Sequence, residues 1–298
     1  MRHVIALLVL LGGWVSVPAA AQNLITNGDF DTDTSGWSTT LNADEFWDPS
    51  DERDLGGSGS LRAEAPDPTS SISIFSACTP VNAGTVYAFG GSVRVPEELK
   101  GVSFNVTARL RFTPAANCSG SLQSDTGDST VLLTESWGPV QGTATAPPGA
   151  THALLLFNIV HAGTPVPLEL FVDNAFLVAD RTCINSFSTL CLNDGRFRVW
   201  AEWERPDGSQ GFARTRPLTD DSGYLWFFKS TNIELVTKVL DACAGATHRF
   251  WAFTAGLTNV GVTLRVRDTV AGVTRTYENP LGDAFLPVQD TDAFATCP

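Results

Sequence analysis

The fold class is decided by the stretch Val102-Ser103-Phe104-Asn105-Val106-Thr107-Ala108-Arg109-Leu110-Arg111-Phe112, in which apolar and polar side chains alternate without interruption. An alternation with period two places every second side chain on the same face of a β-strand. The stretch therefore predicts a long strand with one buried face and one face turned to solvent.

Further strands are expected on both sides of this stretch. Residues 71–75, 86–89 and 153–157 are short runs rich in apolar side chains. Residues 233–240 fit either a strand or a two-turn helix, and their β-branched side chains favour the strand. No long stretch has the period of a helix. Short strands separated by Gly and Pro turns predict an all-β protein of antiparallel β-sandwiches.

The second half of the chain contains two predicted hairpins. Residues 196–203 alternate and end in Pro206-Asp207-Gly208, and Asp-Gly is a hairpin turn signal. Residues 264–267 and 273–277 flank a second turn at Val270-Ala271-Gly272. These hairpins predict a second sandwich beside the first.

The charge distribution divides the chain near residue 180. The whole chain has a net charge of −13, with 32 acidic and 19 basic side chains. Nearly all of the acid excess lies between residues 22 and 180, whereas residues 181–298 are almost neutral. We expect one domain over 22–180 and a second over 181–298. Because nucleic acids and anionic membranes bind clustered Lys and Arg, the acid excess argues against both as partners.

The first residues are typical of a secretory signal peptide. A basic start, Met1-Arg2-His3, is followed by an apolar run over 4–17 and by Pro18-Ala19-Ala20-Ala21. Cleavage after Ala21 is expected. The alternative is a membrane anchor, but the run is shorter than the roughly 20 residues that a spanning helix needs. No later stretch is apolar enough to span, so we expect no membrane insertion and a secreted bacterial product, extracellular or periplasmic.

Six cysteines, an even number in an exported chain, predict disulfide bonds. If the bonds stay within domains, Cys78 pairs with Cys118. The other four allow three pairings. The preferred prediction is Cys183–Cys297, tying the ends of the second domain, with Cys191–Cys243. The alternative is Cys183–Cys191 with Cys243–Cys297.

Four motifs of the first half occur in a family order. They are Asn-Gly-Asp-Phe-Asp at 27–31, Gly-Trp at 36–37, Ser-Gly-Ser-Leu at 58–61 and Val-Asp-Asn-Ala-Phe at 172–176. In this order they resemble the jelly-roll carbohydrate-binding modules of the galactose-binding-like superfamily. The resemblance covers residues 23–180. It implies a jelly-roll fold for the first domain and a polysaccharide or other glycan as ligand, although one fold hosts many functions.

The same resemblance implies a structural calcium ion. In the resembling modules, calcium lies between the acidic residue after the motif Phe and the acidic residue of the last strand. Carried over, these are Asp31 and Asp173, with Asp29 as a further ligand. Calcium binds six to eight oxygen atoms, which suits carboxylates and backbone carbonyls. The alternative is that these acids are solvated side chains at strand ends.

The candidate ligand-binding residues centre on an acidic segment, residues 44–54, that also contains Phe46 and Trp47. Such a charged run is usually a solvated loop. However, exposed aromatic rings can stack on the C–H face of a sugar while carboxylates accept its hydroxyl hydrogen bonds. The expected platforms and polar partners are Trp47 first, then Trp137, Tyr87, Asp48, Asp51 and Arg62. The alternative for each aromatic residue is core packing.

The second half resembles a β-rich C-terminal module of secreted bacterial proteins with no assigned activity, over residues 183–298. The resembling segments include Leu190-Cys191-Leu192-Asn193-Asp194-Gly195 and Ser222-Gly223-Tyr224-Leu225-Trp226. The resemblance agrees with export and implies no reaction for this domain.

No catalytic residues are predicted. The sequence has no Gly-x-Ser-x-Gly elbow, no His-Glu-x-x-His helix and no phosphate-binding glycine loop. A carboxylate pair such as Glu135 with Glu169 can be nominated, but so many acids give that choice little weight. The leading hypothesis is a non-catalytic glycan-binding protein. A structural or adhesive surface protein that binds other proteins is the second hypothesis, and an unrecognised hydrolase is the third.

Overall fold

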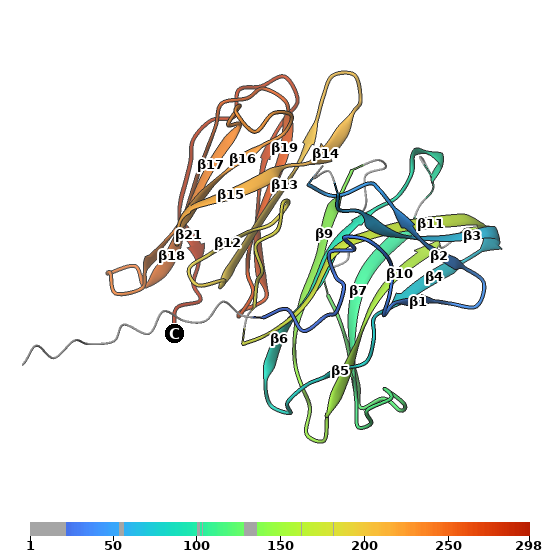
Figure 1. The fold of residues 1–298 in the computed structure, drawn as a ribbon. Helices are drawn as coiled ribbons and strands as arrows, with labels where there is room; N and C mark the ends of the chain where they lie inside the picture. Colours follow the sequence, from blue (N-terminus) through green and yellow to red (C-terminus); the bar gives the residue numbers. More distant parts are fainter. Residues whose placement is uncertain are drawn as a thin grey trace, which may run out of the picture.

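The computed structural model describes residues 22–53, 57–99, 102, 104–127, 136–161, 163–180 and 182–298. The predicted signal peptide, Asp54 and Glu135 lie outside these ranges. The described chain is almost entirely β-strand and antiparallel, with a short 3-10 helix, η1 (Glu97–Leu99). Figure 1 shows four sheets arranged as two pairs that lie side by side. Within the described part of the chain, no helix is long and apolar enough to cross a bilayer.

The first pair of sheets is built from strands between residues 38 and 179. One sheet has the order β1 (Ser38–Thr39), β4 (Ser71–Phe75), β10 (His152–His161), β7 (Phe104–Thr113) and β8 (Gln123–Thr126), with β5 (Thr79–Pro80) beside β10. The other has the order β2 (Asp44–Asp48), β3 (Ser60–Thr69), β11 (Val166–Ala179), β6 (Val86–Arg94) and β9 (Gly138–Thr145).

Successive strands of this domain cross repeatedly from one sheet to the other, which makes it a jelly roll. The chain changes sheet between β1 and β2, β3 and β4, β5 and β6, β6 and β7, β8 and β9, β9 and β10, and β10 and β11. The alternation predicted around residue 107 is confirmed in β7, where Val106, Ala108, Leu110 and Phe112 are fully buried. These side chains meet those of the opposite sheet in one core.

The second pair of sheets follows and encloses a separate core. One sheet has the order β12 (Leu190–Leu192), β13 (Phe197–Glu204), β19 (Gly261–Asp268) and β20 (Val273–Asn279), with β14 (Gln210–Phe212) beside β13. The other has the order β15 (Arg214–Thr219), β16 (Ser222–Trp226), β17 (Leu235–Ala242), β18 (Arg249–Gly256) and β21 (Val288–Phe294). The ambiguous segment near residue 237 is a strand, as its β-branched side chains indicate.

Both predicted hairpins of the second half are confirmed. Strand β13 pairs with β14 across the turn that contains Gly208, and β19 pairs with β20 across the turn that contains Gly272. These glycines have φ angles of 80° and 71°. Positive φ costs glycine little because it has no Cβ, which explains why the sequence places glycine at these two turns.

The three disulfide bonds correct one prediction. Cys78–Cys118 forms as expected, but the preferred pairing of the other four cysteines is wrong, because Cys183 bonds Cys191 and Cys243 bonds Cys297. The reason is the position of β21, which pairs antiparallel with β18. This pairing brings the C-terminal end beside the turn between β17 and β18, where Cys243 lies.

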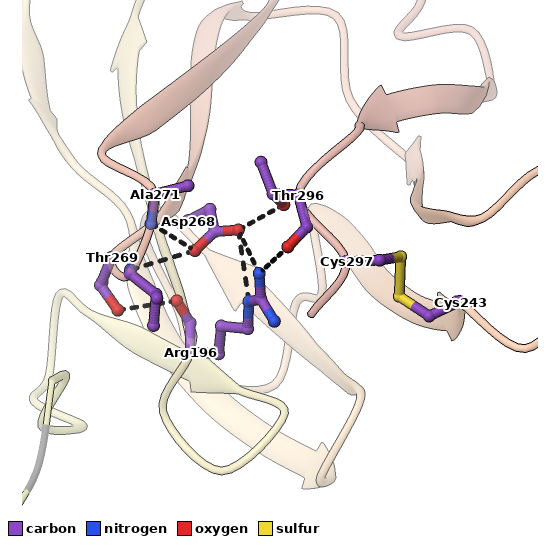
Figure 2. A network of polar contacts seen from close by, with 8 residues as sticks. Arg196, Cys243, Asp268, Thr269, Ala271, Thr296 and Cys297 are labelled. Carbon is purple, nitrogen blue, oxygen red and sulfur yellow. Dashed lines mark hydrogen bonds and ion pairs between the residues drawn. A yellow bond between two sulfur atoms is a disulfide. The ribbon is translucent and has the colours of Figure 1, made fainter.

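A polar network stabilises the end of the second domain that contains the Cys243–Cys297 disulfide bond (Figure 2). The Arg196 guanidinium donates to the carboxylate of fully buried Asp268 at 3.0 Å and also to the Thr296 carbonyl. Burial alone would raise the pKa of Asp268, but hydrogen bonds from Arg196 and Thr296 hold this pKa below its usual value. The network joins the start of β13, the turn after β19 and the C-terminal segment next to Cys243–Cys297.

Removing the disulfide bond that closes the longer loop is expected to destabilise the protein more than removing the bond that closes the shorter loop. Cys243–Cys297 spans 54 positions and Cys183–Cys191 spans 8. In the chain-entropy description, the lost constraint on the unfolded state amounts to about 4 kcal/mol for the first and roughly 2.5 kcal/mol for the second. Urea unfolding of the two double Cys→Ala variants measures both values. Equal losses, or peptide mapping that finds Cys183 bonded to Cys297, would contradict the pairing.

Candidate functional site

The acidic segment that was expected to be a loop begins as an edge strand. Residues 44–48 form β2, which pairs with β3. Phe46 and Trp47 lie next to each other on this strand, with 47% and 40% of their surfaces exposed. Neighbouring side chains of a strand point to opposite faces, so the two rings present surfaces on both sides of the edge. The Trp47 indole N–H donates to the Phe30 carbonyl at 2.8 Å, which fixes its ring.

A row of aromatic and guanidinium side chains crosses the outer face of this sheet. Phe46 lies opposite Arg62, Arg62 opposite Phe171, and Phe171 opposite Arg94 on successive strands. The Arg94 guanidinium carbon lies 3.8 Å from the Phe171 ring centre and 5.3 Å from that of Trp137. Phe171 and Trp137 are buried, so the row is open to solvent at its Phe46 end.

Carboxylates flank the open end of the row. Arg62 donates to both Glu64 and Glu169, and Asp44 lies opposite Glu64 on the neighbouring strand. Burial raises the pKa of Glu169, and the positive charge of Arg62 opposes that shift. The open end therefore combines an exposed ring with several hydrogen-bond acceptors and a cation, which is a suitable surface for a polyhydroxylated ligand.

The structure brings together some of the predicted ligand residues and separates others. Arg62 lies at the open end, whereas Trp47 lies opposite buried Leu61 and points to the other face of the sheet. Asp48 is half-buried at the end of β2, where it accepts hydrogen bonds from Ser50. Their ligand contacts stay a prediction.

The expected exposure of three other residues is wrong. Tyr87 is buried because it points into the core from β6, and its hydroxyl accepts a hydrogen bond from the Asn82 N–H. Trp137 is buried beside Arg94, and Asp51 is buried behind β2. These three side chains offer no open surface to a glycan.

Glu52 is the residue that sequence reasoning missed. Its carboxylate accepts hydrogen bonds from Asn174 and from Ser188, both at 3.0 Å. Its backbone N–H donates to Asp173 at 2.9 Å, and its carbonyl accepts from Arg214 at 2.6 Å. One buried residue of the first domain therefore contacts two residues of the second. Nothing in the local sequence marks Glu52 among the other acids of its segment.

Two further contacts support the junction between the domains. The Phe212 N–H donates to Ser136 at 3.0 Å, and the Gln141 amide donates to the Ile184 carbonyl at 3.1 Å. The Phe212 ring lies so close to Gly138 that a Cβ there would fall 2.4 Å from a ring carbon. The glycine is therefore required by the close approach of the two domains.

The three predicted calcium ligands do not form a group. Asp29 and Asp31 are exposed, whereas Asp173 is fully buried and accepts hydrogen bonds from the N–H groups of Glu52 and Asn174. Among the described residues, no set of three or more His, Cys, Asp or Glu side chains is placed to hold a metal ion. Calcium binding at Asp29, Asp31 and Asp173 therefore stays a prediction.

Comparison with known proteins matched neither a family model nor a curated protein. Among solved structures, the chain is similar to the C-terminal family 22 carbohydrate-binding module of Clostridium thermocellum xylanase 10B, at 16% identity and a TM-score of 0.41, covering 54% of this chain and 98% of the module. A CBM22-1 xylan-binding domain from Paenibacillus barcinonensis has 14% identity and a TM-score of 0.39, with 54% and 96% covered.

A third similar structure is the enzymatically active domain of tailspike protein 4 from bacteriophage CBA120, at 15% identity and a TM-score of 0.42. The similarity covers 53% of this chain and 21% of the tailspike chain. In a xylanase structure with CBM22-1 and GH10 modules, the similar part is 31% of that chain. The small modules correspond to about half of the chain. At these low identities and TM-scores, the fold is established by the strand order and register described above.

The raised pKa values of two buried acidic residues lead us to expect that the free energy of unfolding falls as pH rises. Burial raises the pKa of Glu52, and burial also raises the pKa of Asp173 to about 8. The folded state then binds more protons than the unfolded state between about pH 4 and 8, so the free energy of unfolding falls as pH rises through this interval. Urea unfolding in EDTA at pH 5 and pH 8 is expected to give the lower value at pH 8.

Asp173→Asn is the matched control for this dependence. The variant has a lower free energy of unfolding at both pH values, because one of the two backbone N–H groups that Asp173 accepts loses its oxygen acceptor. The fall in the free energy of unfolding between pH 5 and pH 8 is expected to be smaller than in the wild type. A wild-type protein that is equally stable or more stable at pH 8 would contradict the prediction.

Proposed function

We propose that this chain is a secreted, non-catalytic carbohydrate-binding protein whose first domain binds a glycan at the β2 edge. The observation that carries the proposal is the exposed Phe46 ring, which lies opposite Arg62 and so beside the charged group formed by Arg62, Glu64 and Glu169, with exposed Trp47 next to it on the other face of the strand. Solvent exposure of two adjacent large aromatic side chains costs free energy that burial would recover, so a stacking ligand is the function that this arrangement favours.

The proposed contacts follow from the chemistry of a sugar ring. The C–H face of a pyranose packs against the Phe46 ring, where contact removes apolar surface from water. The hydroxyl groups donate to Glu64 and Glu169 and accept from Arg62. Because the row continues into buried Phe171 and half-buried Arg94, the charged residues are held in place before ligand arrives, and less side-chain entropy is lost on binding.

Export is the second part of the proposal. Three disulfide bonds are typical of chains that fold in an oxidising compartment outside the cytosol. Polysaccharides of cell walls and of the surroundings are available there, and a binding protein would hold its own cell or a neighbouring enzyme at such a polymer. The sequence offers no known catalytic motif, which agrees with a binding role.

Replacing Phe46 is expected to abolish most glycan binding without unfolding the domain. The similar modules include xylan-binding and cellulose-binding domains, so affinity gel electrophoresis starts with xylan, soluble cellulose derivatives and mixed-linkage glucans. Phe46→Ala and Trp47→Ala are expected to weaken binding roughly tenfold, which is about 1.4 kcal/mol of lost stacking. Leu122→Ala is the control because Leu122 is similarly exposed, at 46%, in the segment before β8.

Phe46→Ala is the variant that distinguishes a loss of glycan binding from a loss of folding. Trp47 donates a hydrogen bond to Phe30, so its removal also lowers stability, whereas Phe46 makes no such bond among the described contacts. Full retardation of Phe46→Ala, or no retardation of the wild-type protein on a broad glycan panel, would overturn the proposal.

Calcium remains part of the proposal on the resemblance of the motifs alone. A ligand that binds only the folded state raises the melting temperature, so EDTA is expected to lower it and added calcium to restore it. Differential scanning calorimetry with and without EDTA makes the measurement. A melting temperature that neither reagent changes would count against a calcium site.

A further inference from the structure

The outer face of the β15–β18 sheet carries side chains that neither core uses. Leu225, Leu235, Val239 and Ala252 of this sheet point into the second core. Because strand side chains alternate, residues one position away point outwards. These outward residues are Arg214 and Arg216 on β15, Tyr224 and Trp226 on β16, Val236 and Lys238 on β17, and Trp251 and Phe253 on β18.

Aromatic and guanidinium side chains are paired across the first two strands of this face. Arg214 lies opposite Trp226, and Arg216 lies opposite Tyr224. The Tyr224 and Trp226 ring centres are 5.8 Å apart, and the Trp226 ring also meets Phe187 edge-on at 5.6 Å. The register therefore places two arginines beside a continuous aromatic surface.

These residues line a cavity of about 480 Å³ at the sheet edge, with Phe187, Tyr224 and Trp226 as its aromatic walls. Arg214 and Arg216 stand at the same cavity, and Phe228 closes one side. A volume of this size accommodates one or two sugar rings, since pockets for small molecules measure roughly 300 to 1,000 Å³.

The electrostatics of this face differ from those of the first domain. The Arg214 guanidinium stacks on Phe187 at 4.3 Å, and that of Arg205 stacks on Phe228 at 4.0 Å, so both cations are held over aromatic walls. Arg216 is exposed, and among the described residues no carboxylate forms an ion pair with it. Asp221, in the turn between β15 and β16, is already paired with Lys238 at 2.8 Å.

From these contacts we infer that the second domain has its own binding site for an acidic polysaccharide, one whose sugar rings carry carboxylates. Half-buried Tyr224 supplies the stacking surface for a ring, and buried Trp226 packs beside it and supports it. Arg216 binds the carboxylate through its two-pronged guanidinium, which matches the geometry of a carboxylate. This site lies on the other domain from the β2 edge, and it does not depend on glycan binding there.

The charge of the rest of the molecule makes this site selective. Residues 22–180 carry most of the acid excess and repel a polyanion, whereas the second half is almost neutral. A polyanion can therefore approach the chain from the side where the guanidinium groups of Arg205, Arg214 and Arg216 gather. Nonspecific attraction contributes little, so retention of a polyanion depends on this cavity.

The experiment compares polygalacturonate with its methyl-esterified form in native affinity gels of the full-length chain. The two polymers share the same backbone, but esterification removes the carboxylate charge. The wild-type chain is expected to be retarded by polygalacturonate and at least tenfold less by the ester. Arg216→Gln and Tyr224→Ala are each expected to reduce the affinity for polygalacturonate at least tenfold.

Two control variants test whether binding belongs to this cavity. Arg109→Gln removes the same charge from an exposed position on β7 and is expected to bind like the wild type. Phe46→Ala removes the first-domain platform and is also expected to leave polygalacturonate binding unchanged. The two proposed sites can therefore be confirmed or rejected separately.

Circular dichroism and the melting temperature establish that each variant is folded. Three results would overturn the inference: no retardation of the wild type by polygalacturonate, equal retardation by the methyl ester, or full binding by folded Arg216→Gln. A wild-type dimer in solution that Tyr224→Ala converts to a monomer would also overturn it, because a second copy of the chain would then occupy this face.

Discussion

The buried Glu52 carboxylate is the contact on which the arrangement of the two domains depends. It is buried and accepts hydrogen bonds from Asn174 of the first domain and Ser188 of the second. A buried polar group of this kind is costly unless its hydrogen-bond partners are in place. Its backbone at the same time binds Asp173 and Arg214. Because four groups from distant parts of the chain meet at one residue, neither domain can shift without leaving a buried polar group unsatisfied.

This junction also relates the two proposed ligand-binding faces. Arg214 uses one end of its guanidinium to bind the Glu52 carbonyl while its plane stacks on Phe187 at the edge of the second-domain cavity. The first-domain platform lies on β2, a few residues before Glu52 in the chain. The junction therefore holds the two proposed faces in one arrangement, so a neutral glycan at the first and an acidic glycan at the second would lie at a set spacing.

Local patterns predicted the strands well, because a strand is encoded by neighbouring residues. The alternation in β7 and the glycine turns at Gly208 and Gly272 lie within a few residues of the structure that they form. Tyr87 was placed on the wrong face because nearly every side chain of β6 is buried, so no alternation distinguishes its two faces. Glu52 and the cysteine pairing could not be predicted, because their partners are set by which strands lie at the sheet edges. Glu52 meets Ser188 across 136 positions and Arg214 across 162.

The disulfide between Cys243 and Cys297 and the network of Asp268 share one end of the second domain, next to the C-terminus. The last residues of the chain consequently cannot be trimmed without loss. A shortened chain that stops before Thr296 would lose both the covalent tie and the carbonyl that receives Arg196, and Asp268 would be left buried with fewer donors.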